Sequence, residues 1–165
     1  MSVVVLMGSD SDLDQIGSCL EILKQFSVAF EARVMSAHRT PERLHEFVAE
    51  VDAKTSVYIC AAGGAAHLGG VVASLTMRPV IGIPILMSQL GGADSLYSFV
   101  QMPAGVPVAT MGIGKSGAKN AGLLAVQILA LSDPELSEKL LEHRKKMKEE
   151  VAFKDECLQK KLKGE

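Results

Sequence analysis

Residues 2–12 read SVVVLMGSDSD, and this stretch decides the fold class. Its first half, Ser2 to Met7, is a continuous apolar run, which is typical of a strand buried on both faces of a parallel sheet. Its second half is a polar turn, after which apolar residues recur at helical spacing. These residues are Leu13, Ile16, Leu20 and Leu23. A strand, a turn and a helix in this order predict an α/β protein.

The same alternation continues along the chain. Further strands are predicted over residues 28–34, 56–62, 79–84 and 105–113. Helices are predicted from Pro41 onward, over residues 94–100 and over residues 118–131. Residues 1–165 are therefore expected to form one domain, in which a parallel sheet carries helices on both faces.

The last segment, residues 134–165, has a different character. It predicts an amphipathic helix that begins at Asp133-Pro134 and has a charged outer face. A helix from Pro134 to about Leu162 is roughly 40 Å long at ~1.5 Å per residue, which exceeds the width of one such domain. We therefore predict that it packs on a neighbouring subunit. The alternative is a solvated tail after about Val151.

Composition narrows the class of protein. Lys and Arg number 17 against 19 Asp and Glu, a net charge of -2, which argues against a nucleic-acid partner. The first apolar run is too short for a secretion signal or a membrane span. Three cysteines without C-x-x-C spacing are typical of a reduced intracellular chain. We expect a cytoplasmic protein with no membrane partner.

Three polar or glycine-rich turns follow predicted strands, and ligands in such folds bind beyond the carboxyl ends of the strands. In GSDSD, Ser9 and Ser11 can hold a phosphate at a helix start, and Asp12 can accept from ribose hydroxyls. Serine and aspartate are also ordinary helix caps, so a structural role stays open. In AAGGAAH, residues 61–67, the near absence of side chains fits either a tight turn or a wall for a planar ligand. Its His67 could be only a helix cap.

The turn SAHRTP, residues 36–41, carries the most specific chemistry. Thr40 and Pro41 predict a helix start, as its N-cap and first residue. His38 lies outside any apolar period, so a buried structural histidine does not explain it. An imidazole can give and take a proton near neutral pH, and the Arg39 guanidinium suits phosphate. These residues predict proton transfer on a phosphorylated small molecule.

Other chemistries are disfavoured. GIGKSG, residues 112–117, is similar to a nucleotide P-loop, but Ala109 stands where the first glycine of that motif belongs. The four histidines show no metal-ligand spacing, and no G-x-S-x-G elbow is present. We therefore expect no ATP, no metal and no cofactor.

Five motifs in order, GSDSD, SAHRTP, AGGAAHL, PVIGIP and DSLYSFVQMPAGVPVAT, resemble those of the PurE family. These are the 5-(carboxyamino)imidazole ribonucleotide mutases of purine biosynthesis, and the resemblance covers nearly the whole chain. It implies a flavodoxin-like three-layer α-β-α sandwich, assembled as a homo-octamer with active sites near subunit contacts. It also implies that a carboxylate moves from the exocyclic nitrogen of an aminoimidazole ribonucleotide to ring carbon C4, through transient CO2.

The resemblance implies a role for each matching residue. His38 is the catalytic residue, acting as an acid toward the nitrogen and then as a base toward C4. The CO2 must not escape between the two steps, so a closed pocket with small apolar walls is needed. The predicted substrate-binding residues are Ser9, Ser11, Asp12, Ser36, Arg39, Gly63, Gly64, Ala65 and His67.

Two positions depart from the family pattern. The family usually has proline at the position of Gly69 and glycine at that of Ala62. The first change is expected to loosen the loop after His67, and the second adds a methyl group near the expected CO2 site. Neither touches His38 or Arg39, so we expect altered loop mobility with activity retained.

Two other functions are considered. One is the family's second branch, which carboxylates aminoimidazole ribonucleotide directly with CO2. That branch has lysine after the motif histidine and lacks the GGAAH run, so Arg39 and residues 63–67 favour the mutase. The other is a nucleotide-binding module without catalytic activity, which would not need His38.

Overall fold

The computed structural model describes residues 2–87 and 89–164. The chain divides into two compact units, Met1–Leu129 and Ala130–Glu165. The first unit holds the sheet and five helices, and the second holds the whole of one long helix. Among the described residues, no helix is both long and apolar enough to span a membrane.

Five parallel strands form one sheet in the order β2-β1-β3-β4-β5. This is the flavodoxin-like strand order, as predicted. The apolar run Ser2–Met7 forms an interior strand of this sheet, because β1 pairs with both β2 and β3. The strands are β1 (Ser2–Met7), β2 (Phe30–Val34), β3 (Thr55–Ala62), β4 (Val80–Pro84) and β5 (Ala109–Thr110).

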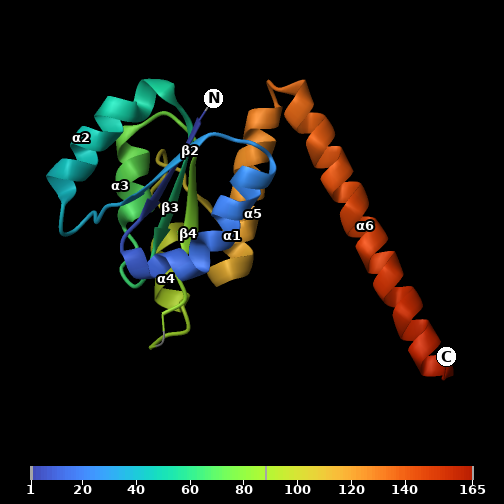
Figure 1. The fold of residues 1–165 in the computed structure, drawn as a ribbon. Helices are drawn as coiled ribbons and strands as arrows, with labels where there is room; N and C mark the ends of the chain where they lie inside the picture. The colour runs from blue at the N-terminus through green and yellow to red at the C-terminus, as the bar shows by residue number, and fades with distance from the viewer. Residues whose placement is uncertain (1, 88, 165) are drawn as a thin grey trace. The chain divides into compact units, whose positions relative to one another are not determined.

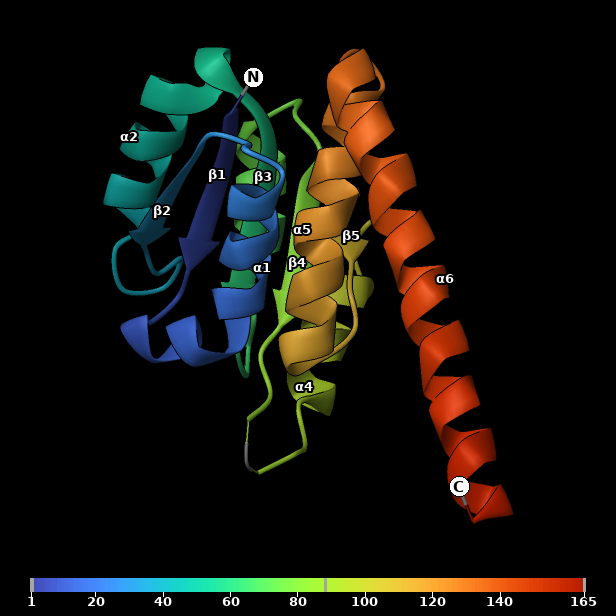
Figure 2. The same cartoon turned by 45° about the vertical axis from the view of Figure 1, so that its right-hand side comes forward.

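Helices cover both faces of the sheet, which confirms the three-layer prediction (Figures 1 and 2). On one face lie α1 (Leu13–Gln25) and α5 (Gly114–Ala130). On the other lie α2 (Pro41–Val51), α3 (Leu68–Leu75) and α4 (Ala93–Val100). Two short 3-10 turns, η1 (Asp10–Asp12) and η2 (Asp52–Lys54), complete the unit.

The core follows from the alternation of side chains along buried strands. Val4 and Leu6 of β1 pack into one apolar cluster with Leu44 of α2, Val72 of α3 and Phe99 of α4. The intervening residues of β1 point to the opposite face, because successive side chains of a strand alternate. A strand buried on both faces therefore needs the unbroken apolar run seen in the sequence.

The predicted strand over residues 105–113 was too long. The structure has only Ala109–Thr110 as β5, which pairs with β4 alone. Gly105 adopts a positive φ of 97° in a turn, and Pro107 has no N–H to donate to a ladder. The chain therefore joins the sheet edge only after these residues.

The P-loop-like segment of residues 112–117 folds onto itself. A Cβ added to Gly117 would overlap the carbonyl oxygen of Gly112, so the turn is closed by direct backbone contact. Gly114 has a φ of 71°, which lets α5 start there, one turn earlier than predicted. Lys115 forms an ion pair with Asp14 of α1 at 3.1 Å, so its ammonium group is engaged by a carboxylate.

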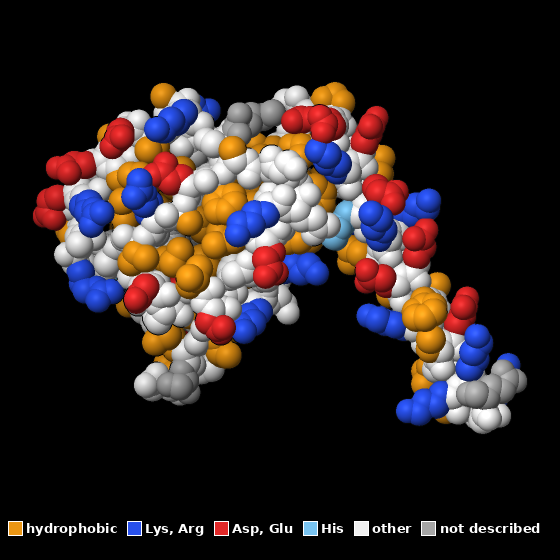
Figure 3. All heavy atoms as spheres, in the orientation of Figure 1, with side chains coloured by type: hydrophobic (Ala, Val, Ile, Leu, Met, Phe, Trp, Pro, Cys, Tyr) orange, Lys and Arg blue, Asp and Glu red, His pale blue; other side chains and the backbone are white. Residues whose placement is uncertain are grey.

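The second unit contains α6 (Pro134–Lys163), which matches the predicted bounds within a residue. The Asp133 carboxylate accepts the Leu136 N–H at 3.1 Å, and Gly164 ends the helix at a φ of 78°. Charged side chains of both signs occur along α6 with hydrophobic ones between them (Figure 3). What this helix packs against stays a prediction.

Gly69 has a packing role that the sequence did not reveal. It lies in α3, fully buried, and a Cβ there would overlap the Phe99 ring. Gly82 of β4 borders the same ring from another side, where a Cβ would also overlap it. The two glycines thus leave a slot that the Phe99 ring fills. Glycine at position 69, where the family usually has proline, therefore makes room for this ring.

We predict that Gly69→Ala lowers the free energy of unfolding by ~1–3 kcal/mol, because the new methyl group overpacks the Phe99 slot. Gly70→Ala is the matched control, since its Cβ would meet only the flexible end of Met102, at 3.2 Å. Denaturant midpoints at one protein concentration measure the difference. Equal midpoints for the two variants would contradict this account of the slot.

Candidate active site

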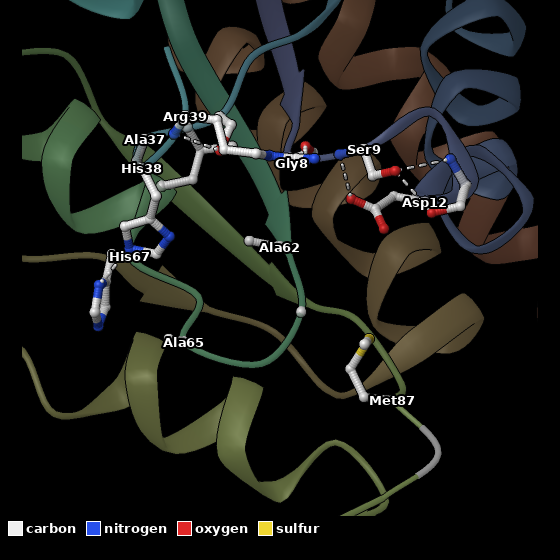
Figure 4. Close-up of a pocket in the computed structure, with 14 residues that line it drawn as sticks. Gly8, Ser9, Asp12, Ala37, His38, Arg39, Ala62, Ala65, His67 and Met87 are labelled. Atoms are coloured by element: carbon white, nitrogen blue, oxygen red, sulfur yellow. Dashed lines mark hydrogen bonds between the residues drawn. The ribbon is translucent and has the colours of Figure 1, made fainter. Parts of the chain in front are cut away.

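The hydrogen-bond ladder of the sheet continues beyond the strand ends and fixes the loops that follow. The Met35 N–H donates to the Met7 carbonyl at 2.9 Å, and the Gly8 N–H donates to the Ala61 carbonyl at 3.1 Å. The loops after β1, β2 and β3 therefore meet at one edge of the sheet. They enclose a cavity of about 440 Å³ (Figure 4).

Every predicted site residue except Gly64 lines this cavity. Gly64 has a φ of 65°, and its N–H donates to the Ser95 hydroxyl at 2.9 Å, so it shapes the turn behind the wall. The predicted residues that the structure brings together are Ser9, Ser11, Asp12, Ser36, His38, Arg39, Gly63, Ala65 and His67.

The hydroxyls of the first loop lie together on one side of the cavity. The Ser11 hydroxyl donates to the Ser9 Oγ at 2.9 Å, and the Ser9 N–H donates to the Asp12 Oδ2 at 3.0 Å. Ser9 and Asp12 thereby form a capping box at η1. The structural role left open by the sequence is therefore shown, and the same capping residues also line the cavity.

Asp12 is a buried carboxylate, with 8 % of its surface exposed. Burial raises its pKa above the ordinary value, although the backbone N–H groups of Ser9 and Gly8 oppose the shift. A buried carboxylate with a raised pKa in a cavity wall is a candidate for ligand binding.

Arg39 bridges the first and second loops. Its Nη2 donates to the Gly8 carbonyl at 3.0 Å, and its Nε lies 3.5 Å from the Ser36 Oγ. Both acceptors are uncharged, so these contacts orient the guanidinium without cancelling its charge. An exposed, oriented guanidinium beside two serine hydroxyls suits a phosphate.

The turn that presents His38 is closed by Thr40, and this corrects one prediction. Thr40 precedes α2 in the N-cap position, but its side chain makes no cap hydrogen bond. Its hydroxyl instead donates to the Ser36 carbonyl at 3.1 Å and accepts the Ser36 N–H at 3.2 Å. The side chain thus locks the loop, and Pro41 begins the helix as predicted.

His38 and His67 form a pair across the cavity mouth (Figure 4). The His38 Nε2 lies 2.8 Å from the His67 Nδ1, and the rings meet edge-on at 83°. His67 makes no side-chain cap bond to α3, so the cap-only interpretation is wrong. A neutral pair holds one hydrogen between these nitrogens, and which ring donates it depends on the tautomers.

Much of the remaining cavity wall is apolar, and the sequence motifs did not identify one of its residues, Met87. Met87 comes from the loop after β4, which the motifs did not include. Its only sequence signal is its position just beyond the carboxyl end of a predicted strand, the usual place for ligand contacts. The apolar lining residues are Ala37, Ala62, Gly63, Ala65, Leu68 and Met87.

Metal or thiol chemistry finds no support among residues 2–87 and 89–164. No group of three or more His, Cys, Asp or Glu side chains there could hold a metal ion. Cys19 and Cys60 are buried, and burial raises the pKa of Cys19 to about 12. Neither thiol lines the cavity, whereas the titratable side chains of Asp12, His38 and His67 do.

Comparisons with known proteins identify the family of the chain. The family model described as AIR carboxylase matches residues 2–150. The N5-carboxyaminoimidazole ribonucleotide mutase of Pyrococcus abyssi is 54% identical over 88% of this chain and 83% of its own length. That of Thermotoga maritima is 49% identical over 95% and 91%. The crystal structure of Treponema denticola PurE has a TM-score of 0.85 at 30% identity and covers 93% of this chain and 95% of its own. The chain belongs to the AIR carboxylase family.

Proposed function

We propose that this chain is an isomerase of purine biosynthesis that converts N5-carboxyaminoimidazole ribonucleotide to the 4-carboxy-5-aminoimidazole ribonucleotide. Two relatives that match most of the chain carry that mutase name. The observation that carries the proposal is the His38–His67 pair, which lines a cavity together with Arg39, three serines and several apolar residues.

The ribonucleotide binds through the polar side. Arg39 and the hydroxyls of Ser9 and Ser11 hold the phosphate, and Asp12 accepts from the ribose hydroxyls. Ser36 supports this arrangement by accepting from the Arg39 backbone N–H at 3.2 Å. The aminoimidazole ring then lies against the backbone of residues 63–65, beside the Met87 side chain that packs over Gly63.

His38 carries one proton through both half-reactions. It donates the proton to the exocyclic nitrogen as the bond from that nitrogen to the carboxylate carbon breaks, which releases CO2. Ring carbon C4 then bonds to the CO2 carbon, and the hydrogen of C4 leaves to the imidazole. His38 ends in its starting state. His67 holds the ring and can exchange the hydrogen of their shared bond as His38 changes from donor to acceptor.

The second candidate is carboxylation of aminoimidazole ribonucleotide by dissolved CO2, the activity in the family model's description. The same cavity would serve it. The 49% and 54% identities to named mutases favour the first candidate. Buried free thiols fit a reducing compartment, and we propose the cytoplasm as the location.

The proposal predicts that His38→Asn lowers kcat by at least ~10²-fold, because asparagine cannot relay a proton. The assay supplies N5-carboxyaminoimidazole ribonucleotide without ATP and follows the 4-carboxy product. His45→Asn is the control, since His45 is an exposed residue of α2 that does not line the cavity.

Three outcomes of this assay would oppose the proposal. Near-normal turnover by His38→Asn would remove His38 from the mechanism. Activity of the wild type only with aminoimidazole ribonucleotide and CO2 would support the second candidate. Tight product binding without turnover by the wild type would support a nucleotide-binding module.

The substitution Asp12→Asn tests separately how the Asp12 charge affects ribonucleotide binding and the stability of the fold. Because burial raises the pKa of Asp12, the folded state holds the proton more tightly than the unfolded state. The wild type thus loses stability as the pH rises from below the ordinary value of 3.8 through the raised pKa. Asparagine still accepts from the Ser9 N–H and escapes this loss.

We therefore expect Asp12→Asn to be at least as stable as the wild type at about pH 7, with the gap closing toward about pH 4. Its KM for the ribonucleotide should rise. Denaturant unfolding across this range, alongside kinetics, measures both effects. A variant that is less stable than the wild type only at the higher pH would show that the carboxylate stabilises the fold.

We also propose that α6 packs on a neighbouring subunit of a homo-octamer. Six of its apolar residues form two series spaced by eleven positions, which keeps these six in one nearly straight stripe along the helix, whereas Leu141 and Phe153 lie outside both series. Several of them, including Val151, are exposed. The stripe consists of Leu136, Leu140, Met147, Val151, Leu158 and Leu162.

Light scattering is expected to show an octamer for the wild type and fewer subunits for Val151→Glu, which puts a charge into the stripe. Glu150→Gln changes a neighbouring residue outside the stripe and should leave the assembly intact. A monodisperse wild-type monomer would contradict this role of α6.

A further inference from the structure

The backbone just before Met87 is fixed at the cavity by several hydrogen bonds. The Leu86 N–H donates to the Gln15 Oε1 at 2.8 Å, and the Gln15 Nε2 donates back to the Leu86 carbonyl at 3.1 Å. One residue earlier, the Ile85 N–H donates to the Ala62 carbonyl at 3.0 Å. Two elements far apart in sequence, α1 and β3, thus set where the Met87 side chain begins.

That side chain occupies the space over Gly63. A Cβ added to Gly63 would lie 2.6 Å from the Met87 Sδ and 2.9 Å from its Cγ. The glycine therefore leaves room for the thioether, which forms part of the cavity wall. Met87 is 39% exposed, so it stands between the cavity and solvent. In Figure 4 it lies on the other side of Ala62 from the two histidines.

The proposed reaction makes a special demand on this part of the wall. Phosphate and ribose are retained by charge and hydrogen bonds, but CO2 is neutral and has no hydrogen to donate. Only a barrier can keep it beside C4 until the new bond forms. The other apolar lining residues are small, or, like Leu68, fully buried in the core. Met87 alone among them is long, flexible and partly exposed.

We propose that Met87 retains CO2 between the two half-reactions and so determines how often a released CO2 is recaptured. This inference rests on the proposed mutase function. Met87 is a positioning residue, because the proton passes through His38 and the transferred carbon never bonds to the thioether. The number of CO2 molecules formed and consumed is the same with or without it, and only escape changes.

The test measures coupling in Met87→Ala. The enzyme is given N5-carboxyaminoimidazole ribonucleotide, and free aminoimidazole ribonucleotide is quantified per 4-carboxy product formed, after subtraction of breakdown without enzyme. We expect this ratio to rise by about tenfold, the typical effect of losing one apolar contact. Met87→Leu, which restores apolar bulk, should stay near the wild type. Leu86→Ala is the matched control, because Leu86 is exposed and does not line the cavity.

Met87→Gln extends the test if the alanine variant does not fold, because it keeps the length of the side chain and adds a polar amide. It is also expected to leak CO2. A wild-type ratio in Met87→Ala, or in Met87→Gln where the alanine variant fails to fold, would overturn the inference. Failure of the proposed function would look different, since the wild type would then form no product from this substrate.

Discussion

The site depends on the hydrogen bonds with which the parallel ladder continues past its strands. Met7 is the last residue of β1, and its carbonyl accepts the Met35 N–H from the loop after β2. Ala61 lies one residue before the end of β3, and its carbonyl accepts the Gly8 N–H from the loop after β1. These bonds place the loops at a common edge before any side chain acts. Arg39 contacts Gly8 in another loop, and His38 contacts His67 in a third. Both contacts are possible because the backbone of these loops is already fixed.

The fold was largely predictable because its signals are local. An unbroken apolar run needs burial on both faces, so β1 followed from residues 2–7, and the parallel sheet followed from the alternation of strands and helices along the chain. Helix α6 was predicted closely because Asp133 and Pro134 mark its start chemically. The fifth strand was overestimated because Pro107 and the turn at Gly105 decide how much edge strand pairs, and apolar alternation does not report this.

Most of the residues that line the cavity were predicted one by one, but their arrangement was not. Loop position and side-chain chemistry identified His38 and Arg39. The bond between His38 and His67 joins residues 29 apart in sequence, and it depends on how two loops lie relative to each other. Met87 belongs to no motif and was missed, and Gly63 was predicted as a substrate contact without any sign that it makes room for the Met87 side chain. Interactions that a side chain makes across loops leave no periodic signal.

The central claim is that one imidazole lies between the two reacting atoms of a bound aminoimidazole ribonucleotide. A crystal structure with the 4-carboxy product bound tests it most directly. The account predicts a His38 ring nitrogen about 3 Å from the exocyclic nitrogen or from C4, with the phosphate beside Arg39 and the carboxylate against Gly63. A product bound with its phosphate toward Met87, or with the His38 ring turned to solvent, would contradict it.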